Sequence, residues 1–349
     1  LALHVGGARE AWAADAAVAR RCLGQSGAAA RIALRREKPE LPETIAEESA
    51  KRGIRILVRE DDEYPSVLRE IAKPPLALFV RGNPIPGAER IAMVGSRHAS
   101  PYGKHAAEEI AMELAKHGVT VVSGAARGID TAAHKGALRA GRTVAVLGCG
   151  ADVAYPKENA RLLDEIAASG SVISEFPPGT QPLPAFFPQR NRIISGLCRG
   201  TVVVEAAERS GSLITAEFAL SEGRDVFAVP GSIYSDTSRG CNRLIQQGAK
   251  LVAAAEDILE EYPWAQGMLA KEKQPELFGD DMPEGLSEEE QRVYALLSKE
   301  EALTVDDIIY RMHGKGNASN VAFLLLQMEL KGFVEEDENH AYSRAVRNR

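Results

Sequence analysis

Short apolar runs of strand length alternate with helix-length segments from about residue 91 onward. Most runs are rich in valine and isoleucine, as buried strands are. Strands that alternate with helices imply a parallel sheet covered by helices on both faces. We therefore predict an α/β fold with a Rossmann-like, mostly parallel sheet. Its expected strands occupy residues 91–94, 119–122, 143–147, 171–174, 201–204, 225–229 and 250–253.

The segment before this pattern, residues 1–82, is predicted to form a small and mostly helical N-terminal domain. Its prolines in Tyr64-Pro65 and Lys73-Pro74-Pro75 punctuate helices rather than continue them. A turn-rich connector at 83–87 then leads into the Rossmann-like domain, which is predicted to span 83–263. The chain begins with Leu1 rather than Met, which is compatible with a truncated N-terminus.

The segment after the sheet pattern begins with an acidic, proline-containing linker at 264–285. Beyond it, two capping-box patterns each open a helix, and a third helix is expected at about 318–331. A charged, hairpin-like tail follows, so we predict a winged-helix domain at 286–349. The two capping boxes run from Ser287 to Glu290 and from Thr304 to Asp307.

The charge distribution permits an anionic ligand at the predicted sheet. The net charge of −7 argues at first against a nucleic-acid partner. Residues 263–349, however, hold 10 Lys+Arg against 17 Asp+Glu, which accounts for the whole excess. Residues 90–210 hold 14 Lys+Arg against 11 Asp+Glu. An anion site is therefore electrostatically feasible there, although strong steering by the whole protein is not expected.

The remaining composition favours a cytoplasmic protein without a cofactor. The four cysteines are far apart and indicate neither a disulfide framework nor a zinc site. No window has the apolar length of a membrane span, and the opening stretch lacks the apolar run of a signal peptide. There is no GxxxxGK[ST] motif and no convincing GxGxxG motif, so neither a P-loop ATPase nor a dinucleotide enzyme is expected.

The first predicted strand ends in Gly95-Ser96-Arg97, and Pro101 suits the first turn of a helix. Such a loop can offer backbone N–H groups at a helix N-terminus, where phosphate binds. Gly95 would let a ligand approach closely, and Arg97 can grip a phosphate with two parallel bonds. A plain tight turn remains the alternative for this loop taken alone.

Small or basic residues follow other predicted strands as well. A lone lysine or a serine-glycine pair is more often a solvated side chain or a helix cap, and Asp130 is interpreted as a cap. Several such loops on one rim nevertheless describe an extended groove for a polyanion. The further groove candidates are Ser123, Gly124, Arg127, Gly128, Lys157, Gly211 and Ser212.

Two arginines flank an amide beside adjacent aromatic residues just before the predicted fifth strand, in Phe186-Phe187-Pro188-Gln189-Arg190-Asn191-Arg192. Guanidinium groups near aromatic faces suit a single strand, whose bases stack while its phosphates are held. We therefore add Phe186, Arg190, Asn191 and Arg192 to the groove. The alternative is that both phenylalanines belong to the core.

Six ordered motifs resemble the DNA-processing protein A (DprA, or Smf) family. They are GSRHASPYG (95–103), SGAARGIDTAAHKGAL (123–138), TVAVLGCGADVAYPKEN (143–159), FPQRNRIISGL (187–197), SGSLITAEFAL (210–220) and VFAVPG (226–231). The resemblance covers roughly residues 64–262, and this ordered spacing is highly specific. One departure is Pro184-Ala185-Phe186, where many members have a basic residue and then a histidine.

The resemblance implies a non-enzymatic protein that binds and protects incoming single-stranded DNA and helps load the RecA recombinase in natural transformation. It also implies a homodimer formed through the core. Arg97 and Lys157 would be the principal basic DNA contacts. Gly95, Ser96 and the Arg190–Arg192 region would border the same groove.

Two further readings stay open: a nucleotide phosphoribohydrolase, and a purely structural adaptor that acts through the winged helix. A nucleotide phosphoribohydrolase on a related fold would show PGGxGTxxE, whereas this chain has EAAERSGSLITAE, with Glu205 as a conceivable acid. The winged helix is expected to contact protein rather than duplex DNA. Its third helix carries only Lys331 as a base and is followed by four acidic residues, whereas a recognition helix needs polar and basic side chains.

Overall fold

The computed structural model describes residues 17–18, 20–22, 37, 40–87, 89–265, 286–297, 303–312, 317–337 and 340–344. The chain divides into two compact units, Leu1–Lys271 and Glu272–Arg349. Most of the predicted linker at 264–285 lies outside the described residues. The finer domain boundaries expected at 82/83 and 263/264 stay predictions.

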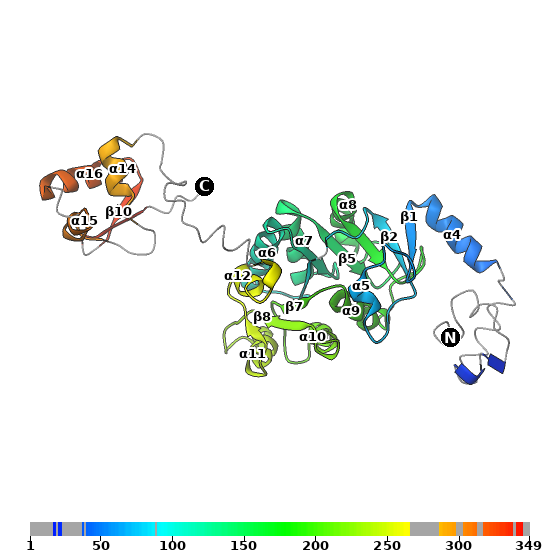
Figure 1. Cartoon of the computed structure of the whole chain (residues 1–349). Helices are drawn as coiled ribbons and strands as arrows, with labels where there is room; N and C mark the ends of the chain where they lie inside the picture. The colour runs from blue at the N-terminus through cyan, green and yellow to red at the C-terminus, as the bar shows by residue number, and fades with distance from the viewer. Residues whose placement is uncertain are drawn as a thin grey trace. The chain divides into compact units, whose positions relative to one another are not determined.

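The first unit is built on a nine-stranded sheet of order β1-β2-β6-β5-β4-β3-β7-β8-β9 (Figure 1). All strands from β3 to β9 pair in parallel, β2 is antiparallel to β6, and β1 is antiparallel to β2. The strands are β1 (Ile54–Val58), β2 (Ala77–Gly82), β3 (Arg90–Val94), β4 (Thr120–Ser123), β5 (Thr143–Leu147), β6 (Ser171–Ser174), β7 (Gly200–Val203), β8 (Asp225–Ala228) and β9 (Lys250–Leu251).

The predicted α/β fold and its seven parallel strands are confirmed, with ends that differ by one or two residues. The prediction that residues 1–82 are mostly helical is wrong for β1 and β2. These two strands extend the sheet at one edge. Pro65 precedes the short helix α5 (Ser66–Arg69), whereas Pro74 and Pro75 precede β2. The N-terminal segment therefore contributes directly to the sheet.

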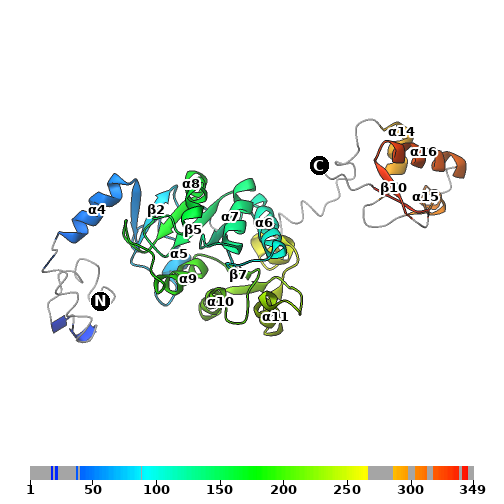
Figure 2. The ribbon, with the colours of Figure 1, turned by 180° about the vertical axis from the view of Figure 1, so that it is seen from behind.

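Helices cover both faces of the sheet, with α6, α7 and α8 on one side and α5, α9, α10 and α11 on the other (Figures 1 and 2). None of the helices formed by the described residues has the length and apolar character of a membrane span. The helices of this unit are α4 (Leu41–Lys51), α5 (Ser66–Arg69), α6 (Pro101–Lys116), α7 (Ile129–Ala140), η1 (Lys157–Asn159), α8 (Ala160–Ser169), α9 (Phe186–Gly196), α10 (Gly211–Ser221), η2 (Asp236–Ser238), α11 (Arg239–Gln246) and α12 (Ala255–Leu259).

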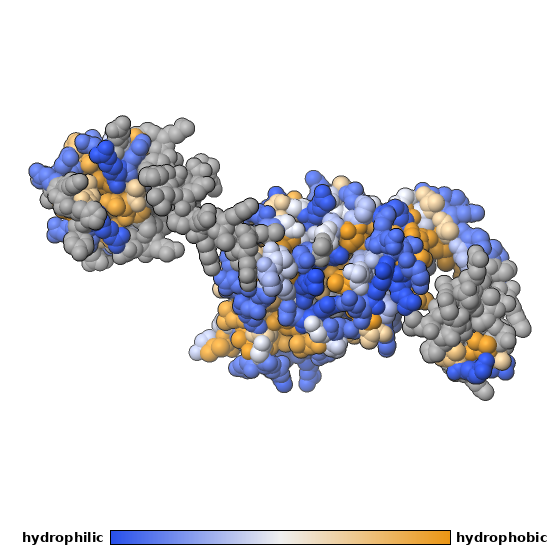
Figure 3. All heavy atoms as spheres, in the orientation of Figure 1, coloured by the Kyte–Doolittle hydropathy of each residue, from blue (hydrophilic) through white to orange (hydrophobic). Residues whose placement is uncertain are grey.

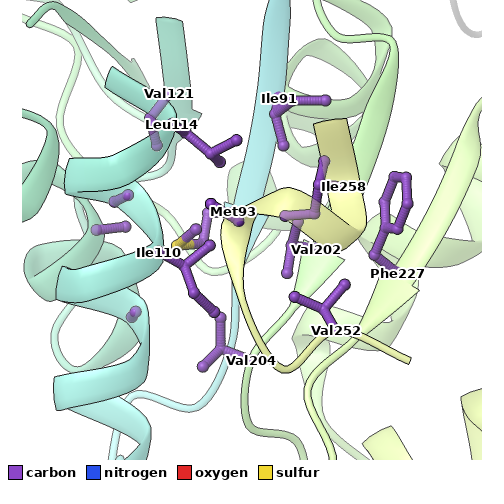
Figure 4. Close-up of a cluster of buried hydrophobic side chains, with 14 of the residues drawn as sticks. Ile91, Met93, Ile110, Leu114, Val121, Val202, Val204, Phe227, Val252 and Ile258 are labelled. Atoms are coloured by element: carbon purple, nitrogen blue, oxygen red, sulfur yellow. The ribbon is translucent and has the colours of Figure 1, made fainter. Parts of the chain in front are cut away.

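The core lies on both sides of the sheet, because alternate residues of each strand point to opposite faces. Ile91 and Met93 of β3 pack against α6 and α7, while Ala92 and Val94 pack against α9 and α10. Figure 4 shows Met93 facing Ile110 of α6 within the first of these clusters. Every residue of β3 is buried, which explains why the strand is apolar from Ile91 to Val94.

The described residues of the second unit form three helices and a two-stranded antiparallel hairpin around an apolar core. Both predicted capping boxes are present, since Glu290 N–H donates to Ser287 Oγ and Asp307 N–H donates to Thr304 Oγ1. Figure 3 shows apolar residues between polar ones on the surface of this unit. Its elements are α14 (Glu288–Tyr294), α15 (Val305–Arg311), α16 (Ala318–Leu330), β10 (Val334–Glu336) and β11 (Tyr342–Arg344).

Candidate functional site

A cavity of about 550 Å³ lies at the carboxyl ends of β3 and β7. These neighbouring strands form the switch point of the sheet, because the chain continues from β3 toward β4 on one side and from β7 toward β8 on the other. Open parallel sheets bind ligands at such a point. The loop after β3, one face of α9 and the start of α10 supply most of the lining residues.

Gly95 is required by internal packing in the loop after β3. A Cβ at this position would lie 2.6 Å from Cγ1 of Ile129 and 2.9 Å from the carbonyl oxygen of Glu205. Ser96 N–H donates to that same carbonyl at 2.6 Å, and His98 N–H donates to Ser96 Oγ at 3.1 Å. The loop is therefore held in one conformation before any ligand arrives, and Gly95, Ser96 and Arg97 all line the cavity.

The buried carboxylate of Glu205 accepts hydrogen bonds at the N-terminus of α6, where a phosphate was expected. Glu205 is only 3% exposed, and its Oε2 accepts hydrogen bonds from Ser100 N–H at 3.0 Å and Ser100 Oγ at 2.9 Å. Ser100 Oγ in turn accepts from Gly103 N–H at 3.0 Å. The expectation that this helix end offers its N–H groups to phosphate is wrong for Ser100 and Gly103, because they already have acceptors. Ligand binding at this loop depends instead on the Arg97 side chain.

Arg97 is exposed at the cavity and lies over an aromatic ring. Its guanidinium carbon is 5.4 Å from the centre of the Phe187 ring, a cation–π distance. The Phe187 ring is itself 5.4 Å from that of Tyr155, which is 41% exposed. Arg97, Phe187 and Tyr155 all line the main cavity and a small adjoining pocket of about 30 Å³. A charged group and two aromatic faces therefore share one surface.

Two further basic residues stand on the neighbouring loops. Arg127 follows β4, lines the small adjoining pocket and forms an ion pair with Glu158, which raises the pKa of Arg127 and lowers that of Glu158. Lys157 begins η1 after β5, and it is exposed with no ion pair among the described residues. Lys157 does not line either cavity, so it lies beyond the groove on the same rim.

Arg190 is buried beneath the cavity rather than displayed on its rim. It is 4% exposed, and its Nη1 donates to the Val146 carbonyl at 2.7 Å. Burial lowers its pKa to about 10, against the opposing charge of Asp130. Burial likewise raises the pKa of the Asp130 carboxyl, while Arg190 opposes that shift. Arg190 therefore contributes positive charge from below. The interpretation of Asp130 as a cap is wrong, because Gly128 is the N-cap residue of α7 and the Asp130 carboxylate accepts from Ala126 N–H at 3.2 Å.

The loop after β4 is mostly structural. Ser123 is fully buried, and its hydroxyl donates to the Met93 carbonyl at 2.6 Å. The prediction that Ser123 lies at the groove is therefore wrong. Gly124 lines the small pocket, where a Cβ would overlap the Arg190 guanidinium. Gly128 has φ +75°, and a Cβ there would overlap the Ser96 carbonyl. These glycines let the two loops and Arg190 pack closely.

The helical form of the segment before β7 changes which of its residues face the cavity. Phe187, Arg190, Asn191 and Ile194 line it, at the spacing i, i+3, i+4 and i+7 of one helix face. Arg190 and Arg192 are about 200° apart around a helix, so both cannot face the same ligand. The cavity is also lined by Phe187, Tyr155 and His98, which were not among the groove residues predicted from the sequence. Phe187 could have been found from its i, i+3, i+4 spacing to Arg190 and Asn191.

The prediction that Phe186 and Arg192 belong to the groove is therefore wrong. Phe186 stacks on Phe176 with ring centres 4.2 Å apart. Arg192 Nη2 donates to both carboxylate oxygens of Glu175, at 2.6 and 2.7 Å, and its side chain is 16% exposed. Both side chains have partners within the protein, and neither lines the cavity.

The start of α10 closes the other side of the cavity. Ser210 caps this helix by accepting the Ser212 N–H at 3.4 Å, and Asn191 Nδ2 donates to the Gly211 carbonyl at 3.3 Å. Gly211 and Ser212 both line the cavity, as predicted for the groove. A Cβ at Gly211 would meet no atom within 4 Å, so this position is open.

Comparison with known proteins identifies the family. The family model of DNA recombination-mediator protein A matches residues 55–263. DNA processing protein DprA of Streptococcus pneumoniae is 52% identical over 204 residues, which cover 58% of this chain and 72% of that protein. Its X-ray structure matches with a TM-score of 0.62 and 45% identity over 68% of this chain and 83% of that chain.

A second solved structure supports the same assignment. DNA processing protein A of Helicobacter pylori matches with a TM-score of 0.54 and 27% identity, and the alignment covers 62% of this chain and 97% of that chain. The family model spans more than half of the chain, and its residues include every loop around the cavity. The chain therefore belongs to the DNA recombination-mediator protein A family.

Proposed function

We propose that this protein binds single-stranded DNA at the cavity between β3 and β7, as a non-enzymatic recombination mediator. The observation that carries the proposal is the exposed Arg97 stacked on Phe187 at the edge of the cavity. Single-strand binders combine positive charge with aromatic faces for the bases. The solved Helicobacter pylori relative is described by its single-stranded-DNA binding mode, which supports the same ligand here.

The DNA track runs along adjacent strand ends. Arg97, Arg127 and Lys157 follow β3, β4 and β5, which are neighbours in the sheet. Arg127 is partly neutralised by Glu158, so Arg97 and Lys157 supply the principal phosphate contacts. Phe187, Asn191, Gly211 and Ser212 form the wall where bases are placed. Arg190 adds positive charge from below the surface.

A titration of oligonucleotide binding at two salt concentrations tests this function. Arg97→Ala is expected to weaken binding to single-stranded DNA and to reduce the slope of log K against log salt by about 0.7, because one phosphate contact releases its counterions. Arg161→Ala is the matched control, since Arg161 is a 92% exposed arginine on α8 paired with Glu165, outside the cavity. Equal binding by wild type and Arg97→Ala would contradict the proposal.

The enzyme reading is less favoured, because Glu205 is already bound within the protein. Both bonds from Ser100 hold its carboxylate under α6, where it is 3% exposed. A general acid must reach the group that it protonates. Release of free base from nucleoside monophosphates by the purified protein would restore the phosphoribohydrolase alternative.

We also propose two protein partners: the RecA recombinase, which the family's description as a recombination mediator supports, and a second copy of this chain. In this proposal the protein protects incoming single strands and helps RecA replace it on them during natural transformation. Strand exchange by RecA on DNA saturated with a single-strand-binding protein is expected to accelerate when this protein is added. An unchanged rate of strand exchange would contradict the proposed role with RecA, but it would not contradict the proposed DNA binding.

The C-terminal unit is proposed to be a winged helix that contacts protein rather than duplex DNA. Phe323, Leu326 and Leu330 are 56%, 51% and 81% exposed on α16, the helix that would enter a DNA groove. Apolar residues there suit a protein surface better than phosphates. Removing residues 272–349 is expected to leave the affinity for single-stranded DNA unchanged. A loss of that affinity in the truncated protein would contradict this role.

A further inference from the structure

The loop after β8 extends the row of loops at the carboxyl edge of the sheet. β8 pairs with β7, so this loop is the next one along after the loop that leads into α10. Two strand spacings, about 10 Å, separate β8 from β3. The loop displays Ile233, which is 73% exposed, and Tyr234, which is 90% exposed. Tyr102 at the start of α6 is 56% exposed beside it.

Hydrogen bonds hold this loop on both sides. Tyr102 Oη donates to the Pro230 carbonyl at 2.9 Å, which ties the loop to the helix that follows Arg97. On the other side, Asn242 accepts from Gly231 N–H at 3.2 Å and donates to the Gly231 carbonyl at 3.0 Å. Ile233 and Tyr234 therefore directly follow a stretch of backbone that is anchored at Pro230 and Gly231. An anchored loop that displays two large apolar side chains indicates a ligand surface.

The chemistry of this loop suits bases rather than phosphates. Residues 230–235 carry no charged side chain, unlike the loops after β3, β4 and β5. Stacking on aromatic rings tolerates any sequence, because every base has a flat face. A strand whose phosphates lie at Arg97 and Lys157 would pass this loop as it leaves the cavity along the edge of the sheet.

We propose that Tyr102, Ile233 and Tyr234 form an aromatic shelf that binds the bases of single-stranded DNA beyond the main cavity. The inference rests on the proposed function and adds a second contact region to it. The main cavity holds a short segment by charge and stacking. The shelf then holds the next nucleotides by stacking alone, so its contribution appears only with longer strands.

Fluorescence anisotropy with labelled oligothymidylates of about 6 and about 20 nucleotides tests the shelf, lengths chosen to bracket ordinary single-strand site sizes. Tyr234→Ala is expected to weaken binding of the longer oligonucleotide on the order of 10-fold, as the loss of one stacked base does. It should leave the shorter one unchanged. The salt slope should also stay unchanged, because no phosphate contact is lost. Tyr234→Phe keeps the ring and is the matched control.

The outcomes separate this inference from the proposed function. Arg97→Ala should weaken both lengths, whereas Tyr234→Ala should weaken only the longer one. If Arg97→Ala weakens binding and Tyr234→Ala has no effect, or an equal effect at both lengths, the shelf is overturned and the proposed function stands. If the wild-type protein binds neither oligonucleotide, both are overturned.

Discussion

Phe186 and Phe187 are adjacent in the sequence, yet their rings have different partners: Phe186 stacks on Phe176, and Phe187 lies beneath Arg97 in the cavity. This difference predicts opposite phenotypes. Phe187→Ala is expected to weaken single-strand binding by about 1–3 kcal/mol, because a base-stacking face and a cation–π partner are both lost. Titration of a fluorescent oligonucleotide measures it.

Phe186→Ala is the matched control for that experiment. It removes the stacked contact with Phe176 and is expected to lower the free energy of unfolding. Binding per folded molecule should stay the same. Equal losses of DNA affinity in Phe186→Ala and Phe187→Ala would contradict the inference that only Phe187 faces the DNA.

Gly95 and Gly211 both line the cavity but tolerate different substitutions. Gly95→Ala would press its Cβ against Ile129 and the Glu205 carbonyl, and overpacking of this kind costs about 1–3 kcal/mol. Gly211→Ala meets no atom within 4 Å and is expected to change stability by less than about 0.5 kcal/mol. Urea unfolding of both variants distinguishes them, and equal stability would contradict the packing role of Gly95.

The core strands were predictable from sequence because each lies buried between two layers of helices. β3 and β5 are buried at every residue, and after their first residues, Arg90 and Thr143, their sequences are apolar. β1 was missed because its exposure is mixed, with Ile54 and Leu57 buried and Val58 exposed. A partly exposed strand near the sheet edge has a weaker pattern than a central one.

The site was predictable as a set of loops but not as a set of side-chain directions. Parallel strands bring the loops with Arg97, Arg127 and Lys157 to one edge, as expected. The bond from Ser100 to Glu205 joins residues 105 positions apart, and no local pattern reveals it. The directions of Arg190 and Arg192 required knowing that their segment is a helix.

Arg190 and Arg192 are expected to act mainly on stability, in different degrees. Arg190→Ala would remove the buried donor to the Val146 carbonyl and the charge that opposes the raised pKa of Asp130, and such a loss costs about 1–3 kcal/mol. Arg192→Ala leaves Glu175 partly exposed to water, so a loss of about 1 kcal/mol is expected. Thermal and urea unfolding measure both losses.

The variant Asp130→Asn provides the control for Arg190→Ala. In the double variant the buried carboxylate is gone, so part of the lost stability should return. DNA affinity per folded molecule should stay unchanged in Arg192→Ala. A large loss of affinity there, without loss of stability, would place Arg192 back in the groove.

His134 is expected to make the fold less stable in acid. Burial lowers its pKa from an ordinary 6.5 to about 3, with the charge of Arg190 acting in the same direction. Its ring nitrogen Nδ1 lies 2.8 Å from Thr143 Oγ1, and that hydroxyl donates to the Val121 carbonyl. The neutral ring must therefore be the donor to Thr143.

The direction of the pH effect follows from these pKa values. Below about pH 6.5 the unfolded chain takes up a proton on His134, while the folded protein does not until about pH 3. The contribution to stability is therefore complete above pH 6.5 and is lost as the pH falls, by up to about 1.4 kcal/mol per pH unit. Between pH 7.5 and 5.5, urea unfolding should show a loss larger by about 1 kcal/mol in the wild type than in His134→Asn. Equal losses in the two proteins would show that the folded protein also protonates His134 in this range.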